Sequence, residues 1–186
     1  MQTFEADIEF FDFNDISGDV DCVLMLDIIG HLRDPETILK KLRRRFSYCA
    51  PQIILTTANI AFFPIRLALL LGQFNYGKRG ILDMHHTRLF TFNSLQRALS
   101  NQGYEIIEEK GVPAPFYLAL GDTRIAHFLI ELNRFLIRIS KRLFAYQIAI
   151  VAKPTPILDL LLENAIQSGQ KKATELANGS SKLSAQ

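Results

Sequence analysis

Three residues that could bind a ligand or move a proton follow an apolar, strand-like run near the start of the chain. Asp27, Ile28 and His31 come directly after the run from Asp19 to Leu26. A histidine at such a position can act as a general base, and it can equally be a structural residue. The Asp27 carboxylate either caps a nearby backbone amide or lines a ligand pocket, because a buried charge needs a partner.

A second group of polar residues lies in the less regular middle section of the chain. Asn59 either lines a pocket or forms a turn. Asp83 either belongs to the pocket or pairs with Arg88, while His86 and Arg88 either contact a ligand or make structural hydrogen bonds. His85 is adjacent to His86, so the two side chains point in different directions and do not readily bind one metal ion. We expect no metal site in this sequence.

The elements that must position these residues form a strand, helix, strand unit. The run from Asp19 to Leu26 is apolar from Cys22 onward, which is typical of a strand buried on both faces of a parallel sheet. A helix begins at Pro35, with Asp34 as its N-cap, and the next strand is Gln52 to Thr57. Because the carboxyl ends of parallel strands meet at one crevice, the polar residues after both strands should face the same ligand.

The second half of the chain predicts two further strands and two helices. We expect a helix capped by Thr91, a strand from Tyr104 to Glu109, a long helix from about Thr123 to Leu143, and a last strand from Tyr146 to Ala152. The long helix has an apolar stripe on one side and basic residues on the other, and it either packs on the sheet or contacts an anionic membrane surface. The segment Phe62 to Leu71 either adds to that contact or forms a lid. The stripe consists of Ile125, Phe128, Leu129, Leu132, Phe135, Leu136, Ile139 and Leu143, and the basic residues are Arg134, Arg138, Lys141 and Arg142.

Length and composition limit the class of protein. The chain has 186 residues, 48% of them hydrophobic, which suits one domain with a buried core. Its mean hydropathy is high at +0.11, but Asn59, Pro64 and Arg66 interrupt the most apolar stretch, so we expect no membrane span. A net charge of +2 does not indicate a nucleic-acid partner. The acidic N-terminus is unlike a signal peptide and the two cysteines suit reduced thiols, so we expect a cytoplasmic protein, either free or peripherally attached to a membrane.

Two sequence motifs resemble those of one enzyme family. The run DVDCVLMLDIIGHL, from Asp19 to Leu32, is followed by RDPE. It resembles the fourth-strand motif of class I S-adenosylmethionine-dependent methyltransferases, roughly FDVVLALDVIEHL followed by DPE. The run LDMHHTRLFTFNSLQRALSNQGYEI, from Leu82 to Ile106, resembles a later signature of that family. With the preceding segment NIAFFPIRLALLLGQFNYGKRGI, the chain is similar to a bacterial subset in which this domain often follows a glycosyltransferase domain.

The resemblance covers about Ala6 to Lys153 and carries expectations for fold and function. It implies an α/β fold with a Rossmann-like, doubly wound, mostly parallel sheet in the order 3-2-1-4-5-7-6. It also implies a methyltransferase that uses S-adenosylmethionine on a small molecule or on a glycan or lipid-linked precursor. The residues that match the family's site are Asp7, Asp27 and Ile28 for the cofactor, His31 and His86 for catalysis, and Asn59, Asp83 and Arg88 for the substrate.

The chain departs from the family pattern at several positions. No two of its ten glycines have the G-x-G spacing of the family's cofactor-binding turn. Gly30 stands where the family has a glutamate before the histidine, and Ala58 stands where it has a proline. The resemblance begins only at the family's third strand, so we expect an N-terminally truncated, incomplete sheet without strands one and two. The remaining function then lies between a methyltransferase and a non-catalytic remnant or assembly module.

An incomplete sheet has consequences for partners and domain limits. The strand that ends at Leu26 should have an exposed edge, which favours pairing with an upstream polypeptide or with a second copy of the chain. We expect a partial methyltransferase-like domain over 1–154. The sequence allows a short helix over 155–167, and the polar composition of 168–186 predicts a disordered tail.

Overall fold

The computed structural model describes residues 3–77, 80–158, 162 and 166 of the chain. The predicted helix over 155–167 therefore falls only partly on described residues, and the predicted tail over 168–186 falls outside them. No helix among the described residues is long and apolar enough to cross a lipid bilayer.

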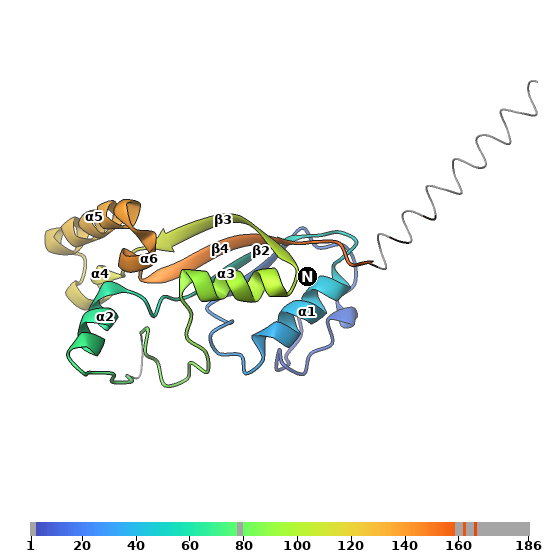
Figure 1. The fold of residues 1–186 in the computed structure, drawn as a ribbon, viewed down its shortest axis with the longest axis horizontal. Coiled ribbons are helices and arrows are strands. Elements are labelled where there is room, and N and C mark those ends of the chain that lie inside the picture. Colours follow the sequence, from blue (N-terminus) through green and yellow to red (C-terminus); the bar gives the residue numbers. More distant parts are fainter. Residues whose placement is uncertain (1–2, 78–79, 159–161, 163–165, 167–186) are drawn as a thin grey trace, which may run out of the picture.

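Four strands form one mixed sheet in the order β1-β2-β4-β3 (Figure 1). β1 and β2 are parallel, whereas β4 is antiparallel to both β2 and β3. Three of the four described strands therefore run in one direction. Their bounds are Cys22–Leu26 for β1, Gln52–Ala58 for β2, Tyr104–Val112 for β3 and Gln147–Pro154 for β4. This order, with its one reversed strand, is the 4-5-7-6 part of the order that the resemblance implies, so that prediction is confirmed.

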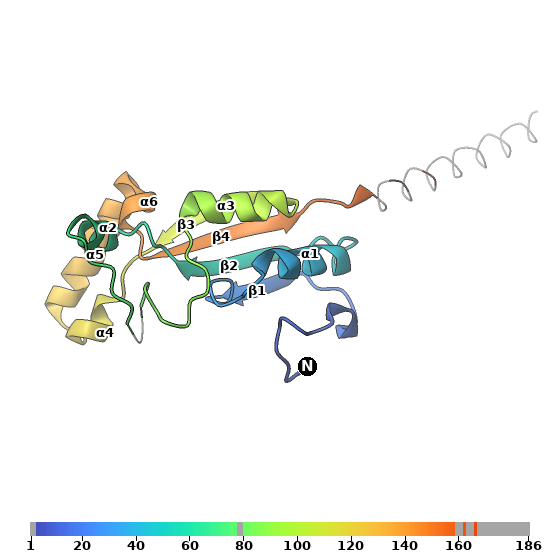
Figure 2. The same ribbon diagram turned by 60° about the horizontal axis from the view of Figure 1, so that its bottom comes forward.

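The helices divide into two groups around the sheet. α1 and α3 cover one face of the sheet, and α2, α4, α5 and α6 gather at the end where β4 begins (Figures 1 and 2). A short 3-10 helix also precedes β1. The helices are α1 Pro35–Arg45, α2 Phe63–Leu70, α3 Phe92–Asn101, α4 Phe116–Leu120, α5 Arg124–Ile139 and α6 Lys141–Phe144, and the 3-10 helix is Phe13–Asp15.

The core lies between the sheet and the pair α1 and α3. Alternate residues of β1, β2 and β4 point into it because successive side chains of a strand face opposite sides of the sheet. Its buried members include Met25, Ile53, Leu55, Ile148 and Ile150 from the strands, and Leu39, Leu42, Phe92, Leu95 and Leu99 from the two helices. Burial of this set is the main force that holds the two layers together.

The expectation that β1 is buried on both faces is wrong. Met25 is buried at 2% exposure, but its neighbours Leu24 and Leu26 are 58% and 54% exposed. Among the described residues, α1 and α3 cover only the Met25 side of the strand. One apolar face of β1 therefore remains open to solvent.

Local side-chain chemistry fixes where the helices of the core begin and end. Asp34 caps α1 by accepting from the Thr37 amide at 3.0 Å, and hydrogen bonds to the side chain and backbone of Thr37 lower the pKa of Asp34. Thr91 and Ser94 form a reciprocal capping box at the start of α3. Gly103 follows α3 with φ of +76°, a conformation that glycine adopts without strain.

The basic residues of α1, which lie between Lys40 and Arg45, do not all point into solvent. A basic run on a helix usually forms a solvated face. The Arg43 guanidinium donates to the carbonyl groups of Gln102, Thr155 and Pro156 and to the Thr155 hydroxyl. Arg45 donates to the carbonyl of Ile16. These arginines thus connect α1 to the chain before β1 and to the ends of α3 and β4.

The predicted long helix is divided in two. α5 ends at Ile139, and Ser140 has an extended backbone before α6 begins at Lys141. α5 is fixed to the domain by Asn133, whose side chain accepts from the Ala114 amide at 2.9 Å and donates to the Phe144 carbonyl at 2.9 Å. Most of the predicted apolar stripe points away from the protein, so it does not pack on the sheet.

Candidate functional site

Asp27 ends β1 in an unusual backbone conformation. Its φ of +55° lies in the left-handed region, which is rare for a residue with a Cβ atom and is often found at functional sites. Its amide donates to both the carbonyl and the hydroxyl of Thr56, at 3.1 and 3.0 Å. Its carboxylate accepts from the side-chain amide of Gln147 at 2.6 Å. Asp27 is exposed, so the structure places an accessible carboxylate at the carboxyl edge of β1 and β2.

The start of β4 places Tyr146 and Gln147 at the edge of the sheet where β1 and β2 end. Burial raises the pKa of the Tyr146 phenol, and the negative charge of Asp27 raises it further. Both residues line a cavity of about 370 Å³ beside α4 and α5. Other lining residues are Val112, Ala114, Tyr117 and Ile130. Gln147 thus lies between this cavity and the Asp27 carboxylate.

His31 and His86 are stacked on one another. Their ring centroids are 4.5 Å apart and the rings are inclined by 26°. His31 Nδ1 lies 3.1 Å from the carbonyl of His85, and His86 Nδ1 lies 3.1 Å from the carbonyl of Ile81. Because a carbonyl can only accept, each Nδ1 must carry the proton, which leaves Nε2 of each neutral ring as an acceptor. The pair can therefore take up a proton from a bound molecule.

Gly30 lies directly beside the stacked imidazoles. Its carbonyl accepts from the amides of Thr87 and Arg88, both at 3.0 Å, and so holds the second histidine's loop against the first. A Cβ atom at position 30 would lie 3.1 Å from Cδ2 of His86 and 3.2 Å from Oγ1 of Thr57. A glutamate at this position, as in the family pattern, would require His86 to move.

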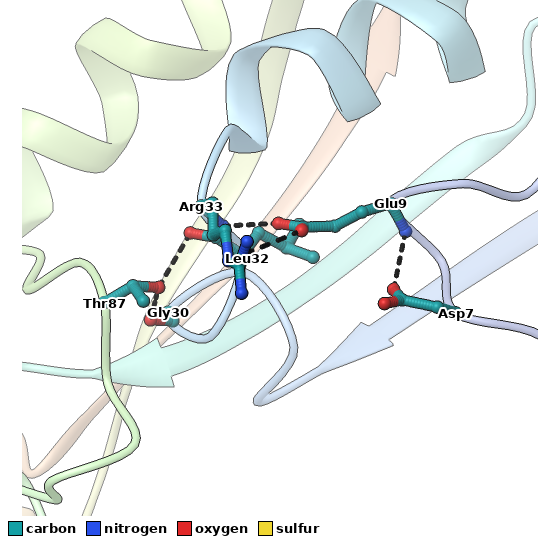
Figure 3. A network of polar contacts seen from close by, with 6 residues as sticks. All are labelled: Asp7, Glu9, Gly30, Leu32, Arg33 and Thr87. Atoms are coloured by element: carbon teal, nitrogen blue, oxygen red, sulfur yellow. Dashed lines mark hydrogen bonds and ion pairs between the residues drawn. The ribbon is translucent and has the colours of Figure 1, made fainter.

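Hydrogen bonds connect the N-terminal segment to the loop after β1 (Figure 3). Glu9 accepts from the Arg33 amide at 2.6 Å, and Asp7 accepts from the Glu9 amide at 3.0 Å. Asp7 is exposed and lies before a turn, whereas the resemblance places it at the end of a strand. The segment that carries Asp7 is thus positioned by the residues that follow His31.

Asp83 and Arg88 do not pair with each other, so that alternative is wrong. The Asp83 carboxylate accepts from the His85 amide at 2.9 Å and lies 2.8 Å from His85 Nδ1. These hydrogen bonds, the one to the backbone first, lower the pKa of Asp83. Arg88 instead donates to Glu36 of α1 at 2.6 Å. Both residues lie on the loop of His86, and their predicted contact with a substrate stays a prediction.

Asn59 is fully buried and Ile28 is half-buried. Asn59 has no exposed surface, and its amide donates to the carbonyl of Ala145 at 2.8 Å and accepts from the amide of Ala61 at 3.1 Å. Ile28 is half-buried against the core. The roles predicted for them also stay predictions, and the protein itself supplies the hydrogen-bond partners of Asn59.

The structure therefore brings together Asp27, His31 and His86 at one edge of the sheet, with Asp7 connected to that edge through Glu9. Sequence reasoning missed Tyr146 and Gln147 as site residues. The signal that could have found them is the antiparallel direction of the last strand. An antiparallel strand begins at the edge where its parallel neighbours end.

Comparison of the sequence with known protein families gives no match, and comparison with curated proteins gives none either. Solved structures with a similar fold are found. A SAM-dependent methyltransferase from Archaeoglobus fulgidus is 16% identical, with 73% of this chain and 59% of that one covered and a TM-score of 0.44. The magnesium protoporphyrin IX methyltransferase of Synechocystis, with bound SAH, is 14% identical over 81% and 49%, with a TM-score of 0.40.

A third solved structure, the cyclase SpnF, is 10% identical to the chain, with 82% of this chain and 56% of that one covered and a TM-score of 0.45. The chain thus spans 59% of the Archaeoglobus protein and about half of the other two. With identities of at most 16% and TM-scores below 0.5, these likenesses carry no argument about activity.

Proposed function

We propose that this edge of the sheet is the acceptor side of an S-adenosylmethionine-dependent methyltransferase. The observation that carries the proposal is the stacked pair of His31 and His86 at the carboxyl edge of β1 and β2, in which each Nδ1 has a carbonyl partner and the His31 side of the pair is exposed. Ligands of α/β sheets of this kind bind at that edge. The two motifs that contain these histidines are also the ones that resemble the methyltransferase family.

The chemistry asked of the protein is proton removal and alignment. S-adenosylmethionine supplies a methyl group that its sulfonium already activates. A hydroxyl or amine acceptor must lose a proton as it attacks, and Nε2 of His31 is the exposed acceptor for that proton. His86 holds the His31 ring in place by stacking, and the His85 carbonyl fixes its tautomer.

The carboxylates at this edge carry the negative charge that would suit a cofactor with a positively charged sulfonium. Asp27 offers an exposed carboxylate whose side-chain partner among the described residues is the amide of Gln147. Asp7 offers a second exposed carboxylate, on the segment that Glu9 connects to Arg33. Ile28 would supply an apolar contact. The acceptor class we propose is a small molecule or a glycan or lipid-linked precursor, with Asp83 and Arg88 on the histidine loop as its contacts. Asn59, whose buried side-chain amide hydrogen-bonds to the backbone of Ala61 and Ala145, would support the substrate side of the site from within the protein.

Calorimetric titration with S-adenosylmethionine tests the proposal. We expect the wild-type chain to bind and Asp27→Asn to bind roughly ten- to a hundredfold more weakly, because a charge-assisted hydrogen bond contributes about 1.5–3 kcal/mol. Asp122→Asn is the matched control, since Asp122 is an exposed carboxylate paired with His127 at the start of α5. Absence of binding by the folded wild-type chain would overturn the proposal in favour of a non-catalytic assembly module.

The role of His31 is tested separately from cofactor binding. His31→Asn keeps a donor for the His85 carbonyl and removes the proton acceptor, so binding of S-adenosylmethionine should be unchanged while transfer of labelled methyl to an acceptor is lost. His127→Asn, which changes a histidine away from this edge, should leave both unchanged. Weaker cofactor binding by His31→Asn would contradict a role confined to the acceptor.

A further inference from the structure

α5 exposes a continuous apolar face that the protein itself does not cover. The exposed fractions along it are 67% for Ile125, 66% for Phe128, 42% for Leu132, 57% for Phe135 and 66% for Ile139. The spacing of three and four residues places all five on one side of the helix. The inward side is a different one, formed by the buried Ala126 and Asn133. The outward apolar face therefore takes little part in packing α5 against the rest of the described protein.

Two neighbouring helices, α2 and α4, carry further exposed apolar side chains at the same end of the molecule. α4 packs on α5, and α2 approaches α6 through the rings of Phe63 and Phe144, whose centroids are 5.6 Å apart. All four helices lie at the same end of the molecule (Figures 1 and 2). Exposed apolar residues of α2 and the residue after it are Leu67, Leu69, Leu70 and Leu71, and those of α4 are Tyr117, Leu118 and Leu120. We call the surface formed by α2, α4 and α5 the apolar end.

The charges around the apolar end are mostly positive. The segments 63–71 and 116–144 contain six arginines and lysines against two acids, which gives them a net charge of +4 with neutral histidines. The whole chain carries only +2, so positive charge is concentrated here. Ion pairs neutralise Arg134, through Glu131, and Lys141, through Glu109. Arg124, Arg138 and Arg142 form no ion pair with a described residue.

We propose that the apolar end is a docking surface for an anionic lipid bilayer. An amphipathic helix that lies in the bilayer surface has this composition, with aromatic and aliphatic residues on one face and arginine or lysine beside them. Negative lipid headgroups attract each basic residue near the surface, which adds to the burial of the apolar side chains. A second copy of the chain fits this surface less well, because two ends of charge +4 repel each other. The inference is independent of methyl transfer.

Vesicle sedimentation tests the proposal with the whole chain. We expect binding to vesicles of equimolar phosphatidylglycerol and phosphatidylcholine, and much weaker binding to phosphatidylcholine alone. Added salt should weaken binding to the anionic vesicles because it screens the arginine charges. Equal binding to both kinds of vesicle, or none to either, would overturn the proposal.

Paired substitutions locate the surface. Phe128→Glu with Phe135→Glu should reduce vesicle affinity roughly a hundredfold, since two aromatic side chains no longer enter the bilayer. Phe10→Glu with Ile107→Glu is the matched control, because Phe10 is 83% exposed and Ile107 is 53% exposed, and both lie outside the apolar end. Circular dichroism verifies that both variants remain folded.

The outcomes separate a membrane from a protein partner. An equal loss of vesicle binding in the control pair would show that general hydrophobicity is responsible and would overturn the proposal. Sedimentation equilibrium supplies the second readout. If the wild-type chain self-associates and only the Phe128 and Phe135 variant is monomeric, with vesicle binding absent throughout, the surface is an interface between copies and the proposal fails.

Discussion

Replacing Gly103 by alanine tests how α1 is fastened to the ends of α3 and β4. Gly103 has φ of +76°, and a Cβ atom there would lie 2.2 Å from Nη1 and 2.3 Å from Cζ of Arg43. The guanidinium is the flexible end of a long side chain, so the backbone need not move. Arg43 must instead give up its hydrogen bonds to Gln102, Thr155 and Pro156.

The magnitude follows from two separate contributions. A residue with a Cβ atom in the left-handed conformation costs about 1–2 kcal/mol relative to glycine. Each of the four hydrogen bonds from Arg43 contributes about 0.5–1.5 kcal/mol net, and water replaces part of them, so their loss costs about 2–3 kcal/mol. The free energy of unfolding should therefore fall by about 3–5 kcal/mol, a large share of the 5–15 kcal/mol typical of a domain.

Equilibrium urea unfolding, followed by circular dichroism, measures this difference. Gly18→Ala is the matched control, because Gly18 has φ of +89° and nothing within 4 Å of its Cβ position. It should show the conformational contribution alone. In an Arg43→Ala background, Gly103→Ala should cost no more than Gly18→Ala. The reasoning is refuted if Gly103→Ala and Gly18→Ala are equally destabilising in the wild type, or if removal of Arg43 leaves the Gly103→Ala effect unchanged.

Three further substitutions test other contacts by the same unfolding measurement. Thr91→Ala removes the capping box of α3 and should lower the unfolding free energy by about 1 kcal/mol; no change would mean that the cap does not contribute. Tyr104→Phe leaves the Leu39 carbonyl without its buried 2.7 Å partner and should cost about 1–2 kcal/mol at neutral pH. Burial raises the pKa of Tyr104, so its contribution to wild-type stability should be constant below about pH 10, the usual phenol pKa, and decline above it; the phenylalanine variant should show a smaller alkaline fall, since only the contribution of Tyr146 remains. The hydrogen bonds from His85 lower the pKa of Asp83, so the stability they give is present above the usual aspartate pKa and is lost as pH falls through the lowered value; Asp83→Asn should lose less stability on acidification, and an identical acid profile would contradict this.

The helix starts of the core are predictable from sequence because capping is local chemistry. Asp34 followed by Pro35, and Thr91 three residues before Ser94, each specify a helix start through side chains only a turn away. The observed helices begin at the expected residues. The strand order is predictable only through the family resemblance, since pairing between distant strands leaves little trace in a single sequence.

The exposed face of α5 and the contribution of Tyr146 could not be predicted in this way. Hydrophobic periodicity marks an apolar side of a helix, but it does not say whether protein, lipid or water covers that side. The inward side is set by Asn133, a polar residue whose burial depends on the backbone groups of Ala114 and Phe144. Tyr146 reaches the site because β4 runs antiparallel to β2, a property of the whole sheet.

The sequence and the structure lead to different interpretations of Gly30. In the sequence it is a departure from the family's glutamate and favours a remnant without activity. In the structure the missing side chain leaves room for His86, whose ring lies 3.1 Å from the Cβ position and stacks on His31. A glutamate at position 30 would press its Cβ atom against His86 and Thr57, so the histidine pair would have to shift by a few tenths of an ångström to accept it. The departure is therefore coupled to the geometry of the candidate base, and by itself it is no argument for loss of function.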